Sequence, residues 1–522
     1  MDTWTADIWN DNEDECKKTL NEPGNWEKIP LLFDDKTTLG SLVRFKGMIQ
    51  DMLNPEYYSS SFTIINAENE EVASRRAKYH SSTQNIQPGE EVVFGNALME
   101  RQIIACIPIP GLNEWAKDLA NANQNVELEN NTNKRIRLDP ACQKYSKEIF
   151  IFVYPEDFDT NELKVNQIVE VVGFLDRRTI QEDNENLHEQ SSIAKETHCI
   201  HAVQLKLMKT LISENEESKN LIWNEALNIH AELKLVLTQA LLGDSLVADY
   251  LLFYLISTTY NRQHNLVPGK FSLNIRGIPE SIDKNYTKHL YSLISYLVVK
   301  SEYLPIQIHT LNNMDMIPRK CYTSNRLLNG LLQLSDRTHL VLDETDLQPG
   351  NLDSKGMKNY EALRNIISNQ QMKYDFTYYG MDYETQIPVL TLSIGKSILP
   401  YDIDIVLKPD PSCSNIEETM NSVHGYLKSQ LHLLDKLRKY IAIISTFPFN
   451  YDEDILKVIE HDYVEMRKAD PKNVSGDDLH RFMMISRLIA LCSGKNEFNK
   501  EIWESGKSLE NQRYLRNKET IH

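Results

Sequence analysis

One apolar segment that ends in two carboxylates constrains this chain more than any other feature. Residues 338–346 read Thr-His-Leu-Val-Leu-Asp-Glu-Thr-Asp, which predicts a buried strand with Asp343 and Glu344 at its end. In nucleotide-hydrolysing motors, such carboxylates hold Mg²⁺ and polarise a water, while a loop of glycine, four residues and Gly-Lys-Ser or Gly-Lys-Thr binds the phosphates. The full loop pattern does not occur in this chain. We therefore expect Asp343 and Glu344 to be structural, facing solvent or capping a helix, rather than to bind Mg²⁺.

The missing loop is expected upstream of this strand. Residues 271–279 predict a buried strand that runs into a turn, and a helix is expected from there through Leu297. The turn carries Glu280 and Asp283, which would repel phosphate, and only one glycine lets backbone amides approach it. The chain is therefore expected to keep the scaffold of a nucleotide-driven motor without catalytic residues, cofactor or metal ion.

Length and charge limit the classes of protein that this chain can be. Its 522 residues are too many for one core and suggest roughly two to four domains. A formal net charge of −19 works against wrapping a phosphate backbone, since each such contact needs Lys or Arg. The charge suits a basic protein surface as partner, or it only keeps the chain soluble. No segment reaches about 18 apolar residues, so no membrane span is expected.

The N-terminal segment and the cysteines favour the cytosol or the nucleus. The acidic segment 1–38 lacks the apolar stretch that a signal peptide needs. The seven cysteines are scattered without a CxxC pair, which favours reduced thiols and argues against zinc and disulfides. The one local metal-like group spans 198–201, where the alternation puts His198 and His201 on opposite faces. A structural role is expected for that group.

Residues 39–210 predict an OB-like β domain. Short β-prone runs separated by turn residues lie over 42–50, 61–65, 92–94, 103–107, 149–153 and 168–175. Between about 113 and 147 the chain is polar and rich in asparagine, which predicts a mobile insertion. A small barrel of about five strands interrupted by this loop is the simplest assembly. The polar stretches 181–196 and 213–220 are expected to form the linker out of it.

Beyond residue 221 the sequence predicts helices that alternate with strands. A long helix is expected over 232–259, and strands are expected over 271–275, 306–310, 339–342 and 389–394. This order predicts a largely parallel α/β domain over 221–410. Residues 411–522 are expected to form a helical, lid-like domain, with helices over 415–445, 452–467, 476–493 and 498–515. The basic end, from Arg513 to Lys518, is expected to be the solvated end of the last helix.

Several of these stretches resemble one family over nearly the whole chain and in order. The stretches that carry the resemblance are 44–58 (Arg-Phe-Lys-Gly-Met-Ile-Gln-Asp-Met-Leu-Asn-Pro-Glu-Tyr-Tyr), 106–111, 240–251, 322–327, 330–334 and 464–468. On these residues the chain is identified as a member of the minichromosome maintenance (MCM) complex-binding proteins.

That family in turn resembles the MCM helicase subunits, which are AAA+ motors. In this comparison 338–346 matches the Walker B strand, and Val389 to Ser393 falls where the sensor-1 strand would be, without the expected asparagine. Tyr401 and Asp402 stand near the position of the arginine finger, and Asp477 stands where the sensor-2 helix would carry arginine. The resemblance therefore implies a degenerate AAA+-like α/β domain, since an arginine finger alone contributes roughly 10³–10⁵ in rate.

Family resemblance implies a non-enzymatic protein that binds MCM helicase subunits in DNA replication. It implies association with assemblies that lack one of the six subunits, and an influence on MCM assembly, nuclear supply, unloading from chromatin and sister-chromatid cohesion. Two other classes stay open: an ATP-driven remodeller of MCM rings, and a single-stranded DNA-binding OB protein. The stacking candidates for the latter are Phe45, Tyr57, Tyr58, Phe62 and Phe94, although such aromatics more often belong to a barrel core.

The nucleus is the expected location, with the cytoplasm as a second compartment. One short basic motif in the polar insertion, Lys134, Arg135 and Arg137, is a candidate nuclear localisation signal. An ordinary charged loop explains it equally well.

Overall fold

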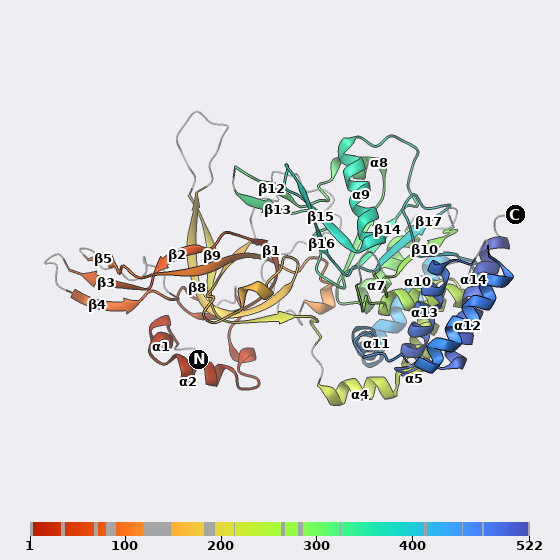
Figure 1. Ribbon diagram of the computed structural model, residues 1–522, viewed down its shortest axis with the longest axis horizontal. Coiled ribbons are helices and arrows are strands. Elements are labelled where there is room, and N and C mark those ends of the chain that lie inside the picture. Colours follow the sequence, from red (N-terminus) through yellow and green to blue (C-terminus); the bar gives the residue numbers. More distant parts are fainter. Residues whose placement is uncertain are drawn as a thin grey trace.

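The computed structural model describes residues 4–32, 37–66, 71–79, 90–117, 148–181, 194–212, 215–262, 267–279, 285–323, 325–411, 413, 415–451, 453–471 and 474–519. A β-rich part formed by the N-terminal residues lies beside an α/β part, and the C-terminal helices lie at the far end of the α/β part (Figure 1). The chain is therefore a mixed α/β protein with several sheets and more than one domain.

Five strands of the β-rich part close into a ring. They are β1 (Leu42–Met52), β6 (Leu98–Ile107), β7 (Ile149–Val153), β8 (Ile168–Gln181) and β9 (Ala194–Met208). Around the ring the order is β1-β8-β9-β7-β6, and β1 pairs with both β8 and β6. All neighbours run antiparallel except β7 and β9, which are parallel. We call these five strands the barrel.

The N-terminal segment packs onto the outside of the barrel. It forms α1 (Ala6–Asp11), α2 (Glu13–Leu20) and a 3-10 turn, η1 (Trp26–Lys28). Trp9 is fully buried, and Trp26 donates from Nε1 to Gln204 Oε1 on β9 at 3.2 Å. These side chains cover the outer face of β7, while its inner face packs in the barrel core. Residues on both faces of β7 are therefore buried, which explains its continuous apolar sequence.

Four further strands extend the β-rich part. β2 (Glu56–Ser59) pairs with β6, while β3 (Ser61–Ile65), β4 (Glu71–Arg76) and β5 (Glu91–Phe94) form a separate sheet in the order β4-β3-β5. The predicted linker at 181–196 is wrong in part, because β8 ends at Gln181 and β9 returns to the barrel from Ala194. Residues 182–193 between them lie outside the described residues.

The α/β part contains a parallel sheet of five strands. They are β10 (Ser272–Arg276), β11 (Ser301–Pro305), β14 (His339–Asp343), β17 (Val389–Ser393) and β18 (Ile403–Val406). Their order is β11-β14-β17-β10-β18, and every neighbouring pair is parallel. Helices α4 (Glu216–Asn224), α5 (Ala226–Ala240), α6 (Ser245–Ile256), α7 (Tyr286–Leu297) and α9 (Ser354–Asn369) belong to the same part. The predicted parallel α/β arrangement is confirmed.

Two predicted elements differ in the structure. The strand expected over 306–310 is wrong: β11 ends at Pro305, and helix α8 (Ile308–Asn313) follows. The single helix expected over 232–259 is two helices, α5 and α6, with Gly243 at φ +88° between them. Leu242, at φ +55°, and Gly243 both have a left-handed backbone that ends α5, and Asp244 then caps the N-terminus of α6.

The C-terminal residues form five helices. These are α10 (Ile416–Ser429), α11 (Leu431–Ile444), α12 (Glu453–Ala469), α13 (Gly476–Cys492) and α14 (Lys500–Glu519). Side chains from α10, α11 and α13 share one core with α5, α6, α7 and β10. The expected helix over 415–445 is interrupted at Gln430, and the other three helices lie close to their predicted positions.

A small second sheet of the α/β part lies toward the barrel. It consists of β12 (Arg319–Cys321), β13 (Arg326–Leu328), β15 (Gln371–Asp375) and β16 (Gly380–Glu384), in the order β13-β12-β15-β16 (Figure 1). Among the helices of the described residues, none alone is long and apolar enough to cross a membrane. The pair α5 and α6, bent by 118°, passes that test only in combination.

Polar side chains of the barrel hold this second sheet. The pairing of β1 with β6 is irregular at Gln50, and both Gln50 and Asp51 are buried. Gln50 Nε2 donates to the Leu327 carbonyl at 2.7 Å, and the Leu327 amide donates to Asp51 Oδ2 at 2.9 Å. Nearby, the Tyr374 hydroxyl donates to Asn166 Oδ1 at 2.7 Å. Because these buried groups are satisfied across the interface, separating the two parts would leave them without partners.

The first residues of the predicted insertion belong to the same interface. Asn113 Nδ2 donates to the carbonyl that follows α7 at 2.7 Å, and Trp115 Nε1 donates to a carbonyl within α7 at 3.0 Å. The guanidinium of Arg438 lies 3.9 Å from the Trp115 ring centroid. Residues 113–117 of the predicted insertion are therefore part of this interface, and 118–147 lie outside the described residues.

His339, the first residue of β14, gives the protein a specific acid sensitivity. Burial and nearby cations lower the pKa of this imidazole to about 4. Its Nε2 donates to the Leu255 carbonyl at 3.1 Å, and its Nδ1 has no partner among the described residues. The unfolded state binds a proton near pH 6.5 and the folded state only near pH 4, so stability falls as pH decreases between these values.

We expect this histidine to contribute roughly 3 kcal/mol of stability near pH 7 that is lost by pH 4. The measurement is chemical denaturation at several pH values for the wild type and for His339→Gln, whose amide keeps the bond to Leu255. The variant should lose less stability than the wild type between pH 6.5 and 4. Parallel curves for the two proteins would show that His339 is not responsible.

Candidate functional site

The first carboxylate at the end of β14 is fully engaged by neighbouring donors. Asp343 Oδ2 accepts hydrogen bonds from Thr287 Oγ1 on α7, at 2.6 Å, and from the Tyr303 hydroxyl on β11. Asp343 Oδ1 accepts from the amide and the hydroxyl of Thr345, at 2.9 and 2.7 Å. The residue is only 7% exposed. Three hydroxyls and one amide thus occupy the directions in which a carboxylate would bind a hydrated cation.

The second carboxylate is bonded to another loop. Glu344 is 6% exposed, and its two oxygens accept from Ser397 Oγ at 3.0 Å and from the Ile398 amide at 3.3 Å. Burial raises the pKa of this carboxyl, and the bonds from the 397–399 loop oppose that shift. The expectation that Asp343 and Glu344 face solvent or cap a helix is therefore wrong in detail. Both are buried acceptors that join β14 to neighbouring segments.

The segment where the phosphate loop is expected lies partly beyond the structure. Glu280 and Asp283 fall outside the described residues. Just before them, β10 ends at Arg276, whose Nε lies 2.9 Å from Asp404 Oδ2 on β18. Gly277 then turns with φ +79°. The cation at the end of β10 is thus paired within the sheet.

The other positions compared with a motor's catalytic set also make local bonds. On β17, the strand compared with sensor 1, Ser393 Oγ donates to Asn274 Oδ1 at 3.0 Å. At the arginine-finger position, Asp402 Oδ2 accepts from the amide and the hydroxyl of Ser272, at 3.1 and 2.8 Å. At the sensor-2 position, Asp477 lies in the first turn of α13, where its charge favours the helix dipole. Each of these groups stabilises an element of the fold.

The end of α14 covers the edge of the parallel sheet. Arg513 Nη1 and Asn517 Nδ2 both donate to the Asp404 carbonyl at 2.8 Å. Arg516 Nη1 lies 2.6 Å from Asp244 Oδ2, at the N-terminus of α6. The expectation of a solvated basic end is therefore wrong for these residues. Their spacing of three and four places them on one face of the helix, which is the signal that could have predicted the contact.

Comparison with known proteins supplies the family. The family model described as "Mini-chromosome maintenance replisome factor" matches residues 16–147 and 122–517. The chain belongs to this family. Relatives named "Mini-chromosome maintenance complex-binding protein" include that of Drosophila melanogaster, 32% identical over 96% of this chain and 94% of the relative. Those of Gallus gallus and Homo sapiens are 31% and 32% identical, over 95% and 91% of this chain and 92% and 88% of the relatives.

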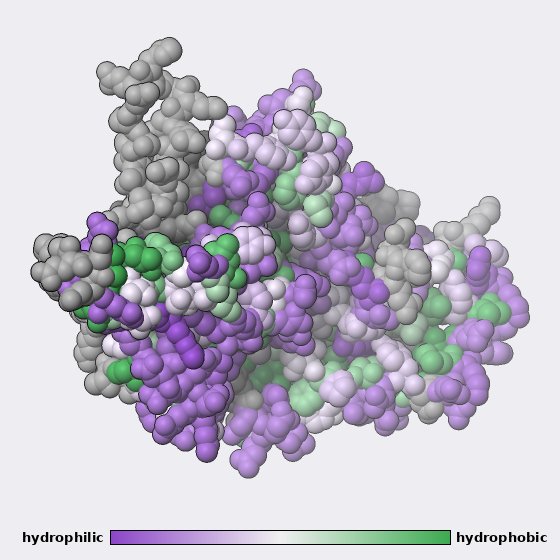
Figure 2. All heavy atoms as spheres, turned by 60° about the vertical axis from the view of Figure 1, so that its left-hand side comes forward, coloured by the Kyte–Doolittle hydropathy of each residue, from purple (hydrophilic) through white to green (hydrophobic). Residues whose placement is uncertain are grey.

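The stacking candidates in this member of the replisome factor family divide into two groups. Phe45 and Phe62 are buried and belong to the core, and Tyr58 is partly buried. Tyr57 and Phe94 are 70% and 53% exposed, on β2 and β5. Figure 2 shows hydrophobic side chains gathered over this end of the β-rich part. The five aromatics therefore do not form one continuous platform.

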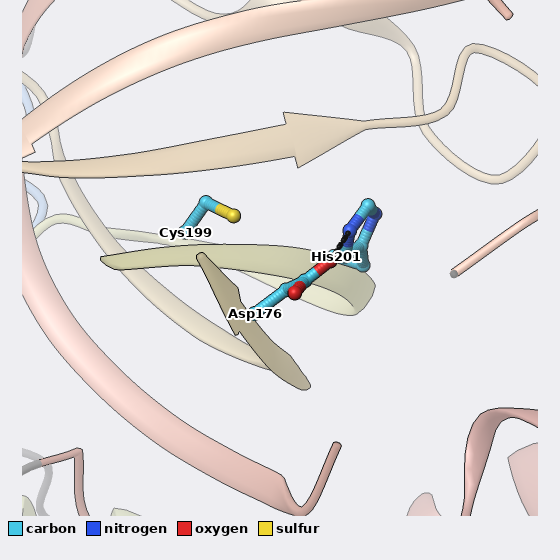
Figure 3. A group of neighbouring side chains, drawn as sticks. All are labelled: Asp176, Cys199 and His201. Carbon is cyan, nitrogen blue, oxygen red and sulfur yellow. Dashed lines mark hydrogen bonds and ion pairs between the residues drawn. The ribbon is translucent and has the colours of Figure 1, made fainter. Parts of the chain in front are cut away.

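One group of metal-capable side chains occurs among the described residues of this family member. Asp176, Cys199 and His201 bring their ligand atoms within 4.8 Å of one another (Figure 3). His201 Nε2 lies 3.2 Å from Asp176 Oδ2, and the Tyr154 hydroxyl lies 2.7 Å from His201 Nδ1. Because both ring nitrogens are engaged by protein groups, the geometry fits a structural hydrogen-bond chain better than a metal site.

The metal-like group considered from the sequence contained His198 and His201, which lie three residues apart on β9. The structure instead joins His201 to Asp176 across the pairing of β8 with β9, where Asp176 lies opposite Cys199. The alternation of Cys199 and His201 on one face was visible in the sequence, but the register that brings Asp176 to them was not.

Proposed function

We propose that this chain is a non-enzymatic binding protein for MCM helicase subunits that acts in DNA replication. The observation that carries this proposal is the similarity, over nearly the whole chain, to relatives named MCM complex-binding proteins. The hydrogen bonds of Asp343 support the non-enzymatic part, since hydroxyls of the chain itself occupy the place of a hydrated Mg²⁺.

The proposed architecture is an OB-like barrel over 39–210 followed by a degenerate AAA+-like domain over 221–410 and a helical lid over 411–522. Support for the first comes from the closed ring of five strands with one parallel pair. Support for the AAA+-like domain comes from the order of the parallel sheet. β14, which ends in the two carboxylates, lies beside β17, and β17 separates it from β10. Within the N-terminal segment 1–38, the described residues cover the outside of the barrel in this scheme.

In this proposal the chain takes the position of a helicase subunit. A ring of helicase subunits with heterologous contacts closes only if every subunit interface forms. A subunit-like protein without catalytic groups would therefore cap the end of an incomplete, open ring. From this we propose effects on MCM assembly, nuclear supply, unloading from chromatin and sister-chromatid cohesion. A nuclear location is also proposed, although the candidate signal Lys134, Arg135 and Arg137 lies outside the described residues.

The test is co-precipitation of the full chain with recombinant MCM subunits after nuclease treatment, combined with an ATPase assay. We expect binding to survive nuclease and ATP turnover to stay at background. The variant Glu344→Gln keeps the size of the side chain and one of its two acceptor oxygens. Because no partner contact is assigned to Glu344, the variant should bind MCM subunits as well as the wild type.

Two results would reject the proposal in favour of the other classes. Loss of binding after nuclease treatment would favour association through DNA, as expected for a single-stranded DNA-binding protein. Stoichiometric ATP turnover that Glu344→Gln abolishes would favour an ATP-driven remodeller.

A further inference from the structure

The second sheet of the α/β part ends in a cluster of aromatic side chains and one methionine, of which all but the partly buried Phe376 are exposed. The cluster lies where β15 turns into β16 and where β12 turns toward β13. We call it the tyrosine tip, and it comprises Tyr322, Phe376, Tyr378, Tyr379 and Met381. Tyr378 is 82% exposed, and Tyr322, Tyr379 and Met381 are 50%, 55% and 43% exposed. Contiguous exposed apolar and aromatic surface of this kind marks interaction sites in soluble proteins.

Contacts within the tyrosine tip fix the rings before any partner arrives. The rings of Phe376 and Tyr379 stack with centroids 5.0 Å apart and an interplanar angle of 7°. Tyr322 donates from its hydroxyl to the Phe376 carbonyl at 2.9 Å, and its ring lies 5.4 Å from that of Tyr378. Rings that are already ordered lose little conformational entropy on binding, which favours affinity.

The base of the same hairpin is anchored to the barrel. Tyr374, four residues before Tyr378, is buried and bonds to Asn166 and to Gln333 of the α/β part. Figure 1 shows the four strands β12, β13, β15 and β16 in the region between the barrel and the parallel sheet. The tip therefore belongs to the sheet that lies between the two parts.

Several rings elsewhere in this molecule lie under a Lys or Arg side chain. Lys206 lies 3.6 Å from the Trp26 centroid, and Arg101 lies 4.1 Å from that of Phe152. Similar cations cover Trp115, Phe150 and Tyr260. In the part of the chain that the structure describes, no Lys or Arg lies over a ring of the tip. Exposed aromatic faces attract cations, and guanidinium groups stack on them best.

We propose that the tyrosine tip docks an arginine-bearing segment of an MCM subunit. The inference rests on the proposed function and adds the surface and the chemistry of the contact. Charge complementarity supports a cationic occupant, because the chain has a net charge of −19. The same charge opposes a nucleic acid on this surface, since phosphates require several cations around each stacking platform.

The test compares three forms of the full chain for binding to nuclease-treated recombinant MCM subunits. In the first, Tyr322, Tyr378 and Tyr379 are all replaced by leucine, which keeps apolar area but removes the aromatic faces. In the second, the same three residues are replaced by phenylalanine, which keeps the faces. The matched control replaces Tyr426 and Tyr514, exposed on α10 and α14, by leucine.

We expect the leucine triple variant to bind at least about tenfold more weakly than the wild type, as two or three exposed cation–π contacts would give. The phenylalanine triple variant and the control should stay within about twofold of the wild type. Because Tyr322 also bonds to the Phe376 carbonyl, Tyr378→Leu alone is measured as well. It makes no such bond and should weaken binding by about threefold.

The outcomes separate this inference from the function on which it rests. If the wild type does not bind MCM subunits, the proposed function fails. If the wild type binds and the leucine triple variant binds equally well, the tyrosine tip is not the docking surface. Equal weakening by leucine and phenylalanine, or tip-dependent binding of an oligo-dT strand in place of MCM subunits, would overturn the arginine-bearing occupant.

Discussion

Replacing Asp244 by alanine is expected to lower the free energy of unfolding by about 3–5 kcal/mol, the range for removing one member of a buried ion pair. Asp244 caps α6 by accepting from the amides of Leu246 and Val247 at 3.1 and 3.2 Å. It also accepts from the Lys408 amide at 2.9 Å and pairs with Arg516 of α14. The Asp244 side chain is 2% exposed, so its loss leaves a partly buried guanidinium and three amides without their acceptor.

The measurement is urea denaturation followed by tryptophan fluorescence for the wild type and Asp244→Ala. Glu465→Gln is a suitable control, because Glu465 also pairs with a cation, Lys468 at 2.9 Å, but both side chains are exposed on α12. Its denaturation midpoint should not change. The companion variant Arg516→Ala should also destabilise the protein, since it leaves the Asp244 carboxylate buried without its cation. Wild-type stability in Asp244→Ala would show that α14 is not held by this residue.

Replacing Arg326 by alanine is expected to separate the unfolding of the barrel from that of the α/β part. Arg326 of β13 pairs with Glu148, which directly precedes β7, and both side chains are less than 10% exposed. Its guanidinium also lies 4.7 Å from the Phe150 ring centroid. Removing the cation takes the Arg326 charge away from the buried Glu148 carboxylate, and losing one member of a buried ion pair costs about 3–5 kcal/mol.

Differential scanning calorimetry checks this expectation. The wild type should unfold with the two parts coupled, whereas Arg326→Ala should show two resolved transitions, because the lost energy lies between the parts rather than within either. Lys358→Ala is the control, since the Lys358 side chain is 66% exposed and its ion pair with Asp375 lies within the α/β part. A single transition displaced to lower temperature in Arg326→Ala would indicate that the stabilisation by this ion pair lies within one part. That result would contradict the prediction.

Most strands of the two main sheets were predictable from the sequence, because strands buried on both faces are apolar; β11 and β18 were missed. The runs at 149–153 and 340–342 are apolar because both faces of their strands are buried, and they lie where the sequence predicts strands. The break between α5 and α6 also has a signal in the sequence, namely Gly243 followed by the capping residue Asp244. The strand expected over 306–310 failed because β-prone residues there follow Pro305, which ends β11, and tertiary contacts turn them into α8.

The bonds around the candidate site were not predictable, because their partners are far apart in the sequence. Thr287, Tyr303 and Asp343 meet only once α7, β11 and β14 are packed together. The contact of Gln50 with Leu327 likewise joins residues 277 positions apart. A polar residue in the sequence gives no sign of which distant backbone group it will satisfy, so the carboxylates were expected to be more exposed than they are.

The polar bonds of Gln50, Asp51, Asn113 and Tyr374 have a consequence for the geometry of recognition. They set a single spacing between the outer surfaces of the barrel and the α/β part, because a change in that spacing would break several buried bonds together. Consider a partner that contacts both outer surfaces and whose two contact sites vary in their separation. Such a partner would match this spacing in only one of its conformations. A chain of this kind would select among the shapes of its partner without changing its own.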